Sequence, residues 1–314
     1  MMKNPESYVA LAPSITKAAS KQTYYTIRFL ADRELAADAY RAYAYFRWVD
    51  DSLDAEAGTR TERLAFIQRQ IRLLEGCYRG EAQQDITPEE KLLVELIHVD
   101  TEKFSGLQSY LRNMMALMAF DAKRRGRLIS QAELNEYTRC LASGVTEAMH
   151  HFIGHRCSSP HNEARNLAVS AAHITHMLRD TFDDLQAGYF NIPSEVLEAN
   201  HIAPQDVNSI PYKIWVRSRV QLARDYFKAG KKYLGQVENL RCQLAGYAYV
   251  TRFEGVLDSI EREEYVLRPA YPERKGLPAI LWASGSILTP LIFHPAIRMA
   301  SASIPALPNI QRKP

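Results

Sequence analysis

The sequence is poor in helix-breaking residues and lacks several common binding motifs. It has 14 glycines and 15 prolines among 314 residues, together below the roughly 12% of average usage. This excludes collagen-like and disordered classes and disfavours a turn-rich all-β fold. The four cysteines are scattered and form no C-x-x-C pair, which argues against a zinc ribbon or a disulfide framework. No G-x-G-x-x-G occurs, so we assign no nicotinamide site.

An excess of charge of one sign is also missing. The chain has 39 basic and 36 acidic residues, with a net charge of +3, which is too balanced for a dedicated nucleic-acid binder. Any anion must therefore be bound by a local arrangement of charge. The N-terminus lacks the continuous apolar run of a secretory signal peptide, and together with the cysteine usage this predicts a cytoplasmic location.

The C-terminal region has no charged residue between positions 276 and 297. This length could span a bilayer, but prolines at 278, 290 and 295 make it a poor membrane helix. We therefore expect one domain over residues 1–275 and an apolar C-terminal segment over 276–314. The segment would pack on the domain or on a membrane surface, with peripheral contact through residues 276–300.

Helical periodicity dominates the rest of the chain, in which 46% of all residues are hydrophobic. Two capping boxes mark helix starts, at Thr87-Pro88-Glu89-Glu90 and at Ser130-Gln131-Ala132-Glu133. Short polar breaks separate the expected helices, and a longer break covers residues 188–211. The pattern predicts a single all-α domain of about ten helices.

Two acidic motifs stand out against this background. Each contains an Asp-x-x-x-Asp pair, Asp50/Asp54 and Asp180/Asp184, which on a helix would share one face. Like charges at this spacing repel each other and stabilise no helix. Mg²⁺, with Mn²⁺ as an alternative, is commonly bound by such carboxylates together with substrate phosphate. The spacing therefore predicts a metal site that binds a diphosphate.

An arginine precedes each pair, Arg47 before the first and Arg179 before the second. Either arginine could contact phosphate oxygens bidentately or hold the carboxylates in place. An alternative prediction is a di-iron site. It rests on two Glu-x-x-His patterns, one at Glu95 and one at Glu147, a spacing used by di-iron bundles. That reading leaves both Asp pairs unexplained. His151 and His155 are expected to form a polar surface.

These motifs resemble those of the squalene/phytoene synthase family over most of the chain. Residues 43–54 (YAYFRWVDDSLD) match the family's first motif closely, and residues 176–184 (HMLRDTFDD) match its second except at the first two positions. Residues 133–145 look like the segment that carries the family's active-site tyrosine, here Tyr137. Residues 256–268 look like its last block, with Arg268 as the phosphate-contacting arginine. Ser20 lies where the family has a phosphate-binding turn.

The resemblance implies an all-α isoprenoid synthase helical bundle around a central apolar cavity. Prenyl diphosphates would bind there, Mg²⁺ would assist departure of one diphosphate, and the resulting cation would be captured by the second chain. Tyr43 and Tyr137 would line the reacting centre. The oligomeric state is left open, and no nucleic-acid partner is expected.

This chain departs from the family pattern at positions that line the expected cavity. The family usually has Gln and Asn at His173 and His176, a glycine at Thr146 beside Val145, and a tyrosine at Asn191. Gln22 and Thr23 also replace the usual residues. Prenyl transfer to a different acceptor and terpene cyclisation therefore stay open as alternatives, as does a non-catalytic assembly or scaffold role.

Overall fold

The computed structural model describes residues 10–55 and 59–271, and every regular element within them is a helix. The predicted all-α class is confirmed, with twelve α-helices and one 3₁₀ helix in these residues. The expected apolar segment over 276–314 lies outside the described residues. The helices are α2 (Leu11–Ala19), α3 (Lys21–Leu30), α4 (Ala36–Asp54), α5 (Arg60–Tyr78), α6 (Pro88–Val99), α7 (Gly106–Arg124), α8 (Gln131–Phe152), η1 (Glu163–Asn166), α9 (Leu167–Arg179), α10 (Thr181–Ala187), α11 (Ser194–Asn200), α12 (Ile210–Leu234) and α13 (Leu240–Arg262).

Local side-chain chemistry sets several of these boundaries. Both predicted capping boxes are present, with Thr87 at the start of α6 and Ser130 at the start of α8. A third box, between Thr59 and Glu62, begins α5 inside a stretch expected only as a polar break. Each cap satisfies backbone N–H groups that the first turn leaves without partners, and is worth about 1 kcal/mol.

Two boundaries differ from the sequence expectation. The long break over residues 188–211 contains a short helix, α11, because its local apolar residues pack against the bundle and Leu197 is buried. The second acidic motif is not one continuous helix, since Asp180 lies at the junction of α9 and α10. The Asp184 N–H still donates to the Asp180 carbonyl at 2.8 Å, so the two carboxylates keep a one-turn spacing.

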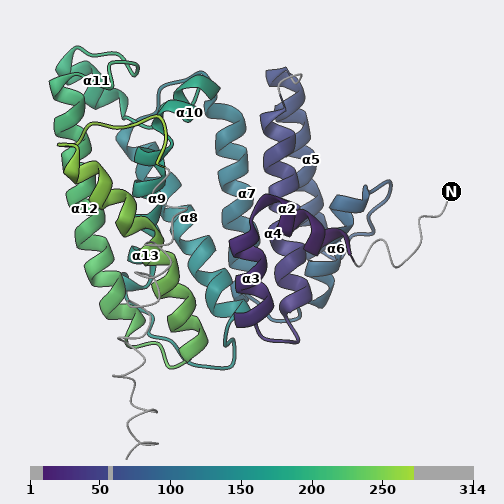
Figure 1. The fold of residues 1–314 in the computed structure, drawn as a ribbon. Coiled ribbons are helices and arrows are strands. Elements are labelled where there is room, and N and C mark those ends of the chain that lie inside the picture. The colour runs from purple at the N-terminus through teal and green to yellow at the C-terminus, as the bar shows by residue number, and fades with distance from the viewer. Residues whose placement is uncertain (1–9, 56–58, 272–314) are drawn as a thin grey trace, which may run out of the picture.

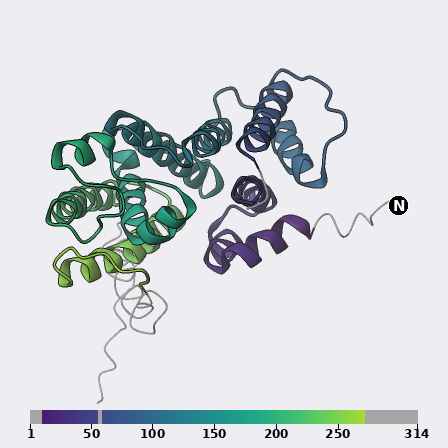
Figure 2. The ribbon, with the colours of Figure 1, turned by 90° about the horizontal axis from the view of Figure 1, so that it is seen from above.

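The helices pack around α7 and α8, which lie in the middle of the bundle (Figure 2). Helices α2 to α6 lie on one side of them, and α9 to α13 lie on the other. The core includes fully buried aromatic side chains, among them Tyr45, Phe227 and Phe253. The Tyr45 hydroxyl donates to the Gln70 side chain at 3.0 Å, so its buried polar atom is satisfied.

This packing brings the ends of α4 and α7 and the whole of α10 to one end of the bundle (Figure 1). A backbone hydrogen bond of 2.8 Å from the Gly126 N–H to the Gly188 carbonyl joins the residues that follow α7 and α10. Gly188 has a φ of 84°, which glycine adopts without strain. Among the described residues, no helix combines the length and apolarity needed to cross a membrane.

Candidate active site

The first acidic motif occupies the last turns of α4. Arg47 donates to Asp50 at 3.3 Å and also bonds Asp51, so in this structure it engages the acidic residues. Burial and the neighbouring charge of Asp54 raise the pKa of Asp50 to about 6. The motif therefore holds more negative charge than its own arginine neutralises.

The second acidic motif spans the junction of α9 and α10. Arg179 forms a bidentate pair with Asp180, while its buried Nη1 atom has no hydrogen-bond partner among the described residues. Burial and the charge of Asp180 raise the pKa of Asp184 to about 6, although a hydrogen bond of 2.6 Å from Asn191 opposes the shift. Both motifs thus contain a carboxyl group whose charge the protein disfavours.

A third carboxylate, Asp121 on α7, lies between the two motifs. Burial raises the pKa of Asp121, and the charge of Asp54 adds to the effect. In turn, the charge of Asp121 raises the pKa of both Asp50 and Asp184. The sequence analysis missed Asp121, because an Asp followed three residues later by an Arg looks like an ordinary helical ion pair.

Tyr137 on α8 is in contact with this central carboxylate. Its hydroxyl donates to Asp121 Oδ2 at 2.9 Å, and burial followed by the charge of Asp121 raises the Tyr137 pKa well above its ordinary value. Tyr137 therefore keeps its proton and presents its ring to the site. Tyr43 on α4 is half-buried four residues before Arg47.

Arg124 joins Asp121 to the residues that follow α10, and the sequence analysis missed it as well. Arg124 Nε donates to Asp121 at 2.6 Å and Nη1 donates to Asn191 at 2.8 Å. Its guanidinium lies 5.1 Å from the Tyr137 ring centroid and 4.9 Å from that of Tyr189. The Tyr189 hydroxyl donates to Asp54 at 3.3 Å, so Arg124 touches groups that contact both motifs.

Two histidines on α9, His173 and His176, pack against aromatic side chains of neighbouring helices. The His173 ring stacks on Tyr137 with centroids 5.1 Å apart, and within residues 10–55 and 59–271 its buried Nε2 atom has no hydrogen-bond partner. His176 packs edge-on against Phe253 at 5.0 Å. Burial lowers the pKa of each histidine to about 3, helped by neighbouring positive charge. Both imidazoles are therefore neutral at ordinary pH.

Positive charge gathers where α9 faces α13 and the start of α3. Burial and the nearby charge of Arg179 lower the pKa of Arg252, a residue that no motif singles out. Arg252 donates to the neutral side chain of Gln22 at 2.6 Å. Ser20 caps α3 two residues earlier and accepts from the Thr23 N–H at 3.2 Å. The two arginines outnumber the single carboxylate, Asp180, that pairs with them, which suits an anionic ligand.

The remaining predicted site residues have the following surroundings. Arg268 forms an ion pair with Glu263 at 3.1 Å and lies over the Tyr271 ring. Val145 is half-buried on α8. Thr146 is buried, and its hydroxyl oxygen has no hydrogen-bond partner in the part of the chain that the structure describes.

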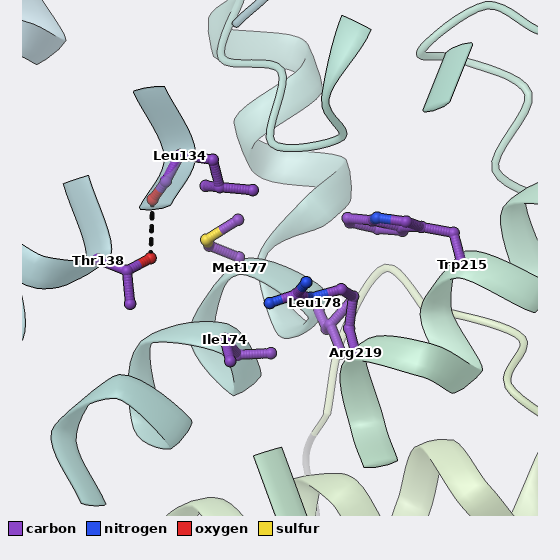
Figure 3. A pocket seen from close by; sticks show the side chains of 7 residues that line it. All are labelled: Leu134, Thr138, Ile174, Met177, Leu178, Trp215 and Arg219. Carbon is purple, nitrogen blue, oxygen red and sulfur yellow. Dashed lines mark hydrogen bonds between the residues drawn. The ribbon is translucent and has the colours of Figure 1, made fainter. Parts of the chain in front are cut away.

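A narrow pocket opens between α8, α9 and α12 (Figure 3). Trp215 and Arg219 from α12 face Met177 and Leu178 from α9, and apolar atoms form most of the lining. Burial lowers the pKa of Arg219. The charge of Arg219 also contributes to the lowered pKa of His173, the residue before Ile174 in the pocket lining.

The donor set of the acidic motifs fits Mg²⁺. Carboxylate oxygens are the ligands that this hard cation prefers. Burial, followed by the charge of a neighbouring carboxylate, raises the pKa of Asp50 and of Asp184, and a bound cation would offset both effects. In the described part of the chain, no three His, Cys, Asp or Glu side chains are already arranged around one metal position.

The Glu-x-x-His patterns have other partners in the structure. Glu147 binds Arg165 at 2.8 Å, and His150 contacts the Tyr233 hydroxyl at 3.1 Å. Glu95 lies 3.2 Å from Arg41. These contacts give the two patterns structural roles, and no observation favours the di-iron alternative.

Residues 16–276 match the model of a family described as squalene/phytoene synthase. A 15-cis-phytoene synthase from Synechocystis sp. (strain ATCC 27184 / PCC 6803 / Kazusa) is 24% identical over 289 residues, which cover 85% of this chain and 82% of that protein.

Solved structures of low sequence identity share the fold. The squalene synthase HpnC from Alicyclobacillus acidocaldarius aligns with a TM-score of 0.65 and 18% identity, over 83% of this chain and 96% of that one. A dehydrosqualene synthase in complex with a ligand aligns with a TM-score of 0.65 and 16% identity, over 92% and 96% of the two chains.

Proposed function

Since this chain belongs to the squalene/phytoene synthase family, it is an enzyme of prenyl transfer, and we propose that it ionises and condenses prenyl diphosphates with Mg²⁺ and releases diphosphate. The observation that carries the proposal is the convergence of two acidic motifs on Asp121, in contact with Tyr137 and beside the arginines of α9 and α13. A squalene, dehydrosqualene or phytoene product in the similar proteins supports the same class of substrate.

The carboxylates of both motifs would hold the metal, namely Asp50, Asp54, Asp180 and Asp184. A bound Mg²⁺ would neutralise the negative charge that develops on the leaving diphosphate. Arg47, Arg179 and Arg252 would bind phosphate oxygens, and the buried Nη1 of Arg179 is a donor without a partner in the described residues. Ser20 and Arg268 remain predicted phosphate contacts.

Aromatic and apolar side chains would protect the carbocation. The Tyr43 and Tyr137 rings each can stabilise a desolvated cation by about 2 kcal/mol. Tyr137 holds its proton at Oη through the bond to Asp121, so its hydroxyl does not act as an anionic nucleophile. The neutral imidazoles of His173 and His176 add no positive charge that would oppose ionisation.

The test is incubation of the full chain with C10, C15 and C20 prenyl diphosphates, with and without Mg²⁺ and NADPH. We expect Mg²⁺-dependent release of diphosphate, and mass analysis of the apolar product then separates condensation from cyclisation or transfer to another acceptor. No release from any of the three substrates would contradict the proposal and favour a scaffold role. The cytoplasmic location stays a prediction. Peripheral membrane contact through residues 276–300 also stays a prediction, because that segment lies outside the described residues.

A further inference from the structure

A hydrogen-bonded chain of side chains links Tyr137 to the second acidic motif. The Tyr137 hydroxyl donates to Asp121 at 2.9 Å, and Arg124 donates to the other oxygen of Asp121 at 2.6 Å. Arg124 also donates to Asn191 Oδ1 at 2.8 Å, and Asn191 Nδ2 donates to Asp184 at 2.6 Å. The five groups come from α8, α7, the segment after α10, and α10 itself.

The direction of each bond makes Asn191 the critical link. A guanidinium only donates and a carboxylate only accepts, whereas an amide does both. Asn191 can therefore accept from Arg124 and donate to Asp184 at the same time. An aspartate here would still accept from Arg124 but would repel Asp184, and a leucine would do neither. The family pattern has tyrosine at this position, so the amide link is a feature of this chain.

The surroundings hold Arg124 in one place. Its side chain is 10% exposed, and its guanidinium contacts the rings of Tyr137 and Tyr189. The neighbouring Arg125 donates to the Ala187 carbonyl at 3.0 Å, which ties the end of α7 to the end of α10. A side chain confined in this way can hold its hydrogen-bond partners in fixed positions, because it loses little conformational entropy when those partners bind a ligand.

We propose that Arg124 and Asn191 are positioning residues that hold the Asp184 carboxylate in register with Tyr137 and Asp121, and thereby set the affinity for Mg²⁺ bound with diphosphate. This inference rests on the proposed function for its biological meaning. Groups that orient metal-binding carboxylates through hydrogen bonds commonly change metal affinity 10- to 100-fold when they are removed.

The first test is calorimetric titration of the full chain with Mg²⁺ in the presence of inorganic diphosphate. We expect Asn191→Leu and Asn191→Asp each to weaken binding at least about tenfold. Asn191→Asp is nearly isosteric and keeps the acceptor for Arg124, so it replaces the donor to Asp184 with a repelling charge and guards against a folding defect. Asn200→Leu is the matched control, since the Asn200 side chain is exposed and donates to the Val196 carbonyl of its own helix. Binding by Asn191→Asp equal to that of the unmodified protein would overturn the proposal.

A second test asks whether the two residues act through one connection. Arg124→Met and Asn191→Leu both interrupt the same chain of bonds, so the double variant should bind no more weakly than the worse single variant. Losses that multiply would show independent effects and would contradict the inference. Thermal unfolding of each variant checks that the fold is retained.

The calorimetric readout separates this inference from the proposed function, because it needs no prenyl substrate. Binding that depends on Asn191, in a protein that releases no diphosphate from prenyl substrates, would contradict only the function. Normal turnover with Mg²⁺ binding that ignores Asn191 would contradict only the positioning role. A protein that binds no Mg²⁺ with diphosphate at all would overturn both.

Discussion

Two clusters that contain carboxylates, at opposite ends of α4, show how differently one fold treats an acidic side chain. Asp32, just before α4, is 7% exposed and accepts from the Gly154 N–H at 2.9 Å, from His155 Nδ1 at 2.9 Å and from Arg241. Burial alone would raise its pKa, but these hydrogen bonds outweigh burial and lower it. At the other end, burial and like charges raise the pKa of Asp50 to about 6.

The contrast distinguishes Asp32, a carboxylate that stabilises the fold, from Asp50 and Asp184, carboxylates that are expected to bind a ligand. Asp32 has a donor for nearly every lone pair, so its charge contributes to folding. Asp50 and Asp184 face other carboxylates, and the structure gives them fewer donors than Asp32. Folding alone gains nothing from that arrangement, which is expected where a cation is to bind.

The largest effect should come from neutralising an acid of the candidate site. Asp50→Asn removes a predicted metal ligand, and loss of several kcal/mol of transition-state stabilisation corresponds to roughly a thousandfold or greater fall in diphosphate release. The free energy of unfolding should stay unchanged or rise, since one of several mutually repelling charges is gone. Release assays and urea denaturation measure the two quantities, and full turnover in the variant would remove Asp50 from the site.

At Asp32, before the start of α4, we expect a substitution to lower stability and to leave activity unchanged. Asp32→Ala leaves Arg241 and the N–H groups of the 154–155 turn without their acceptor, and should lower the free energy of unfolding by about 3 kcal/mol. Activity per folded molecule should be retained. Asp225→Ala is the control, because Asp225 is exposed on α12 and its hydrogen bond is to Gln221. A loss no larger than in the control would show that the two ends do not differ as described.

Much of the fold and both acidic motifs could be predicted from sequence because their signals are local. The capping boxes at Thr87 and Ser130 and the spacing of Asp50 and Asp54 lie within one or two helical turns. Asp121 and Arg124 carry the pattern of any helical ion pair, and only tertiary packing places them between the motifs. Arg252 was missed for the same reason, since its partners Gln22 and Arg179 are distant in sequence.

A smaller effect than either carboxylate change is expected from Arg252. Arg252→Gln should raise the KM for a prenyl diphosphate about tenfold with little change in kcat, as for loss of one charge-assisted hydrogen bond. The matched control is Arg139→Gln, because Arg139 is exposed and pairs with Glu136 on its own helix. An unchanged KM in Arg252→Gln would place the phosphate elsewhere, for example at Arg268.

The smallest effect is a pH dependence of stability that has opposite signs at the two ends. The folded-state pKa of Asp50 and Asp184 lies above the value near 3.8 of the unfolded chain. The folded protein therefore binds more protons between pH 4 and 6, and their contribution to stability falls as pH rises through that window. The pKa of Asp32 is lowered, so its contribution is present above pH 3.8 and is lost only as pH falls through its folded value.

Urea denaturation without Mg²⁺ at several pH values between 4 and 7.5 tests this sign. The unfolding free energy of the unmodified protein, relative to the Asp50→Asn/Asp184→Asn double variant, should decrease from pH 4 to about pH 7 and then stay constant. The change should be under about 1 kcal/mol, because the Asp50 side chain is 42% exposed and solvent screens its interactions. A difference that instead grows with pH would mean that hydrogen bonds outweigh repulsion at the acidic motifs, as they do at Asp32. The two ends of α4 would then hold their carboxylates in the same way.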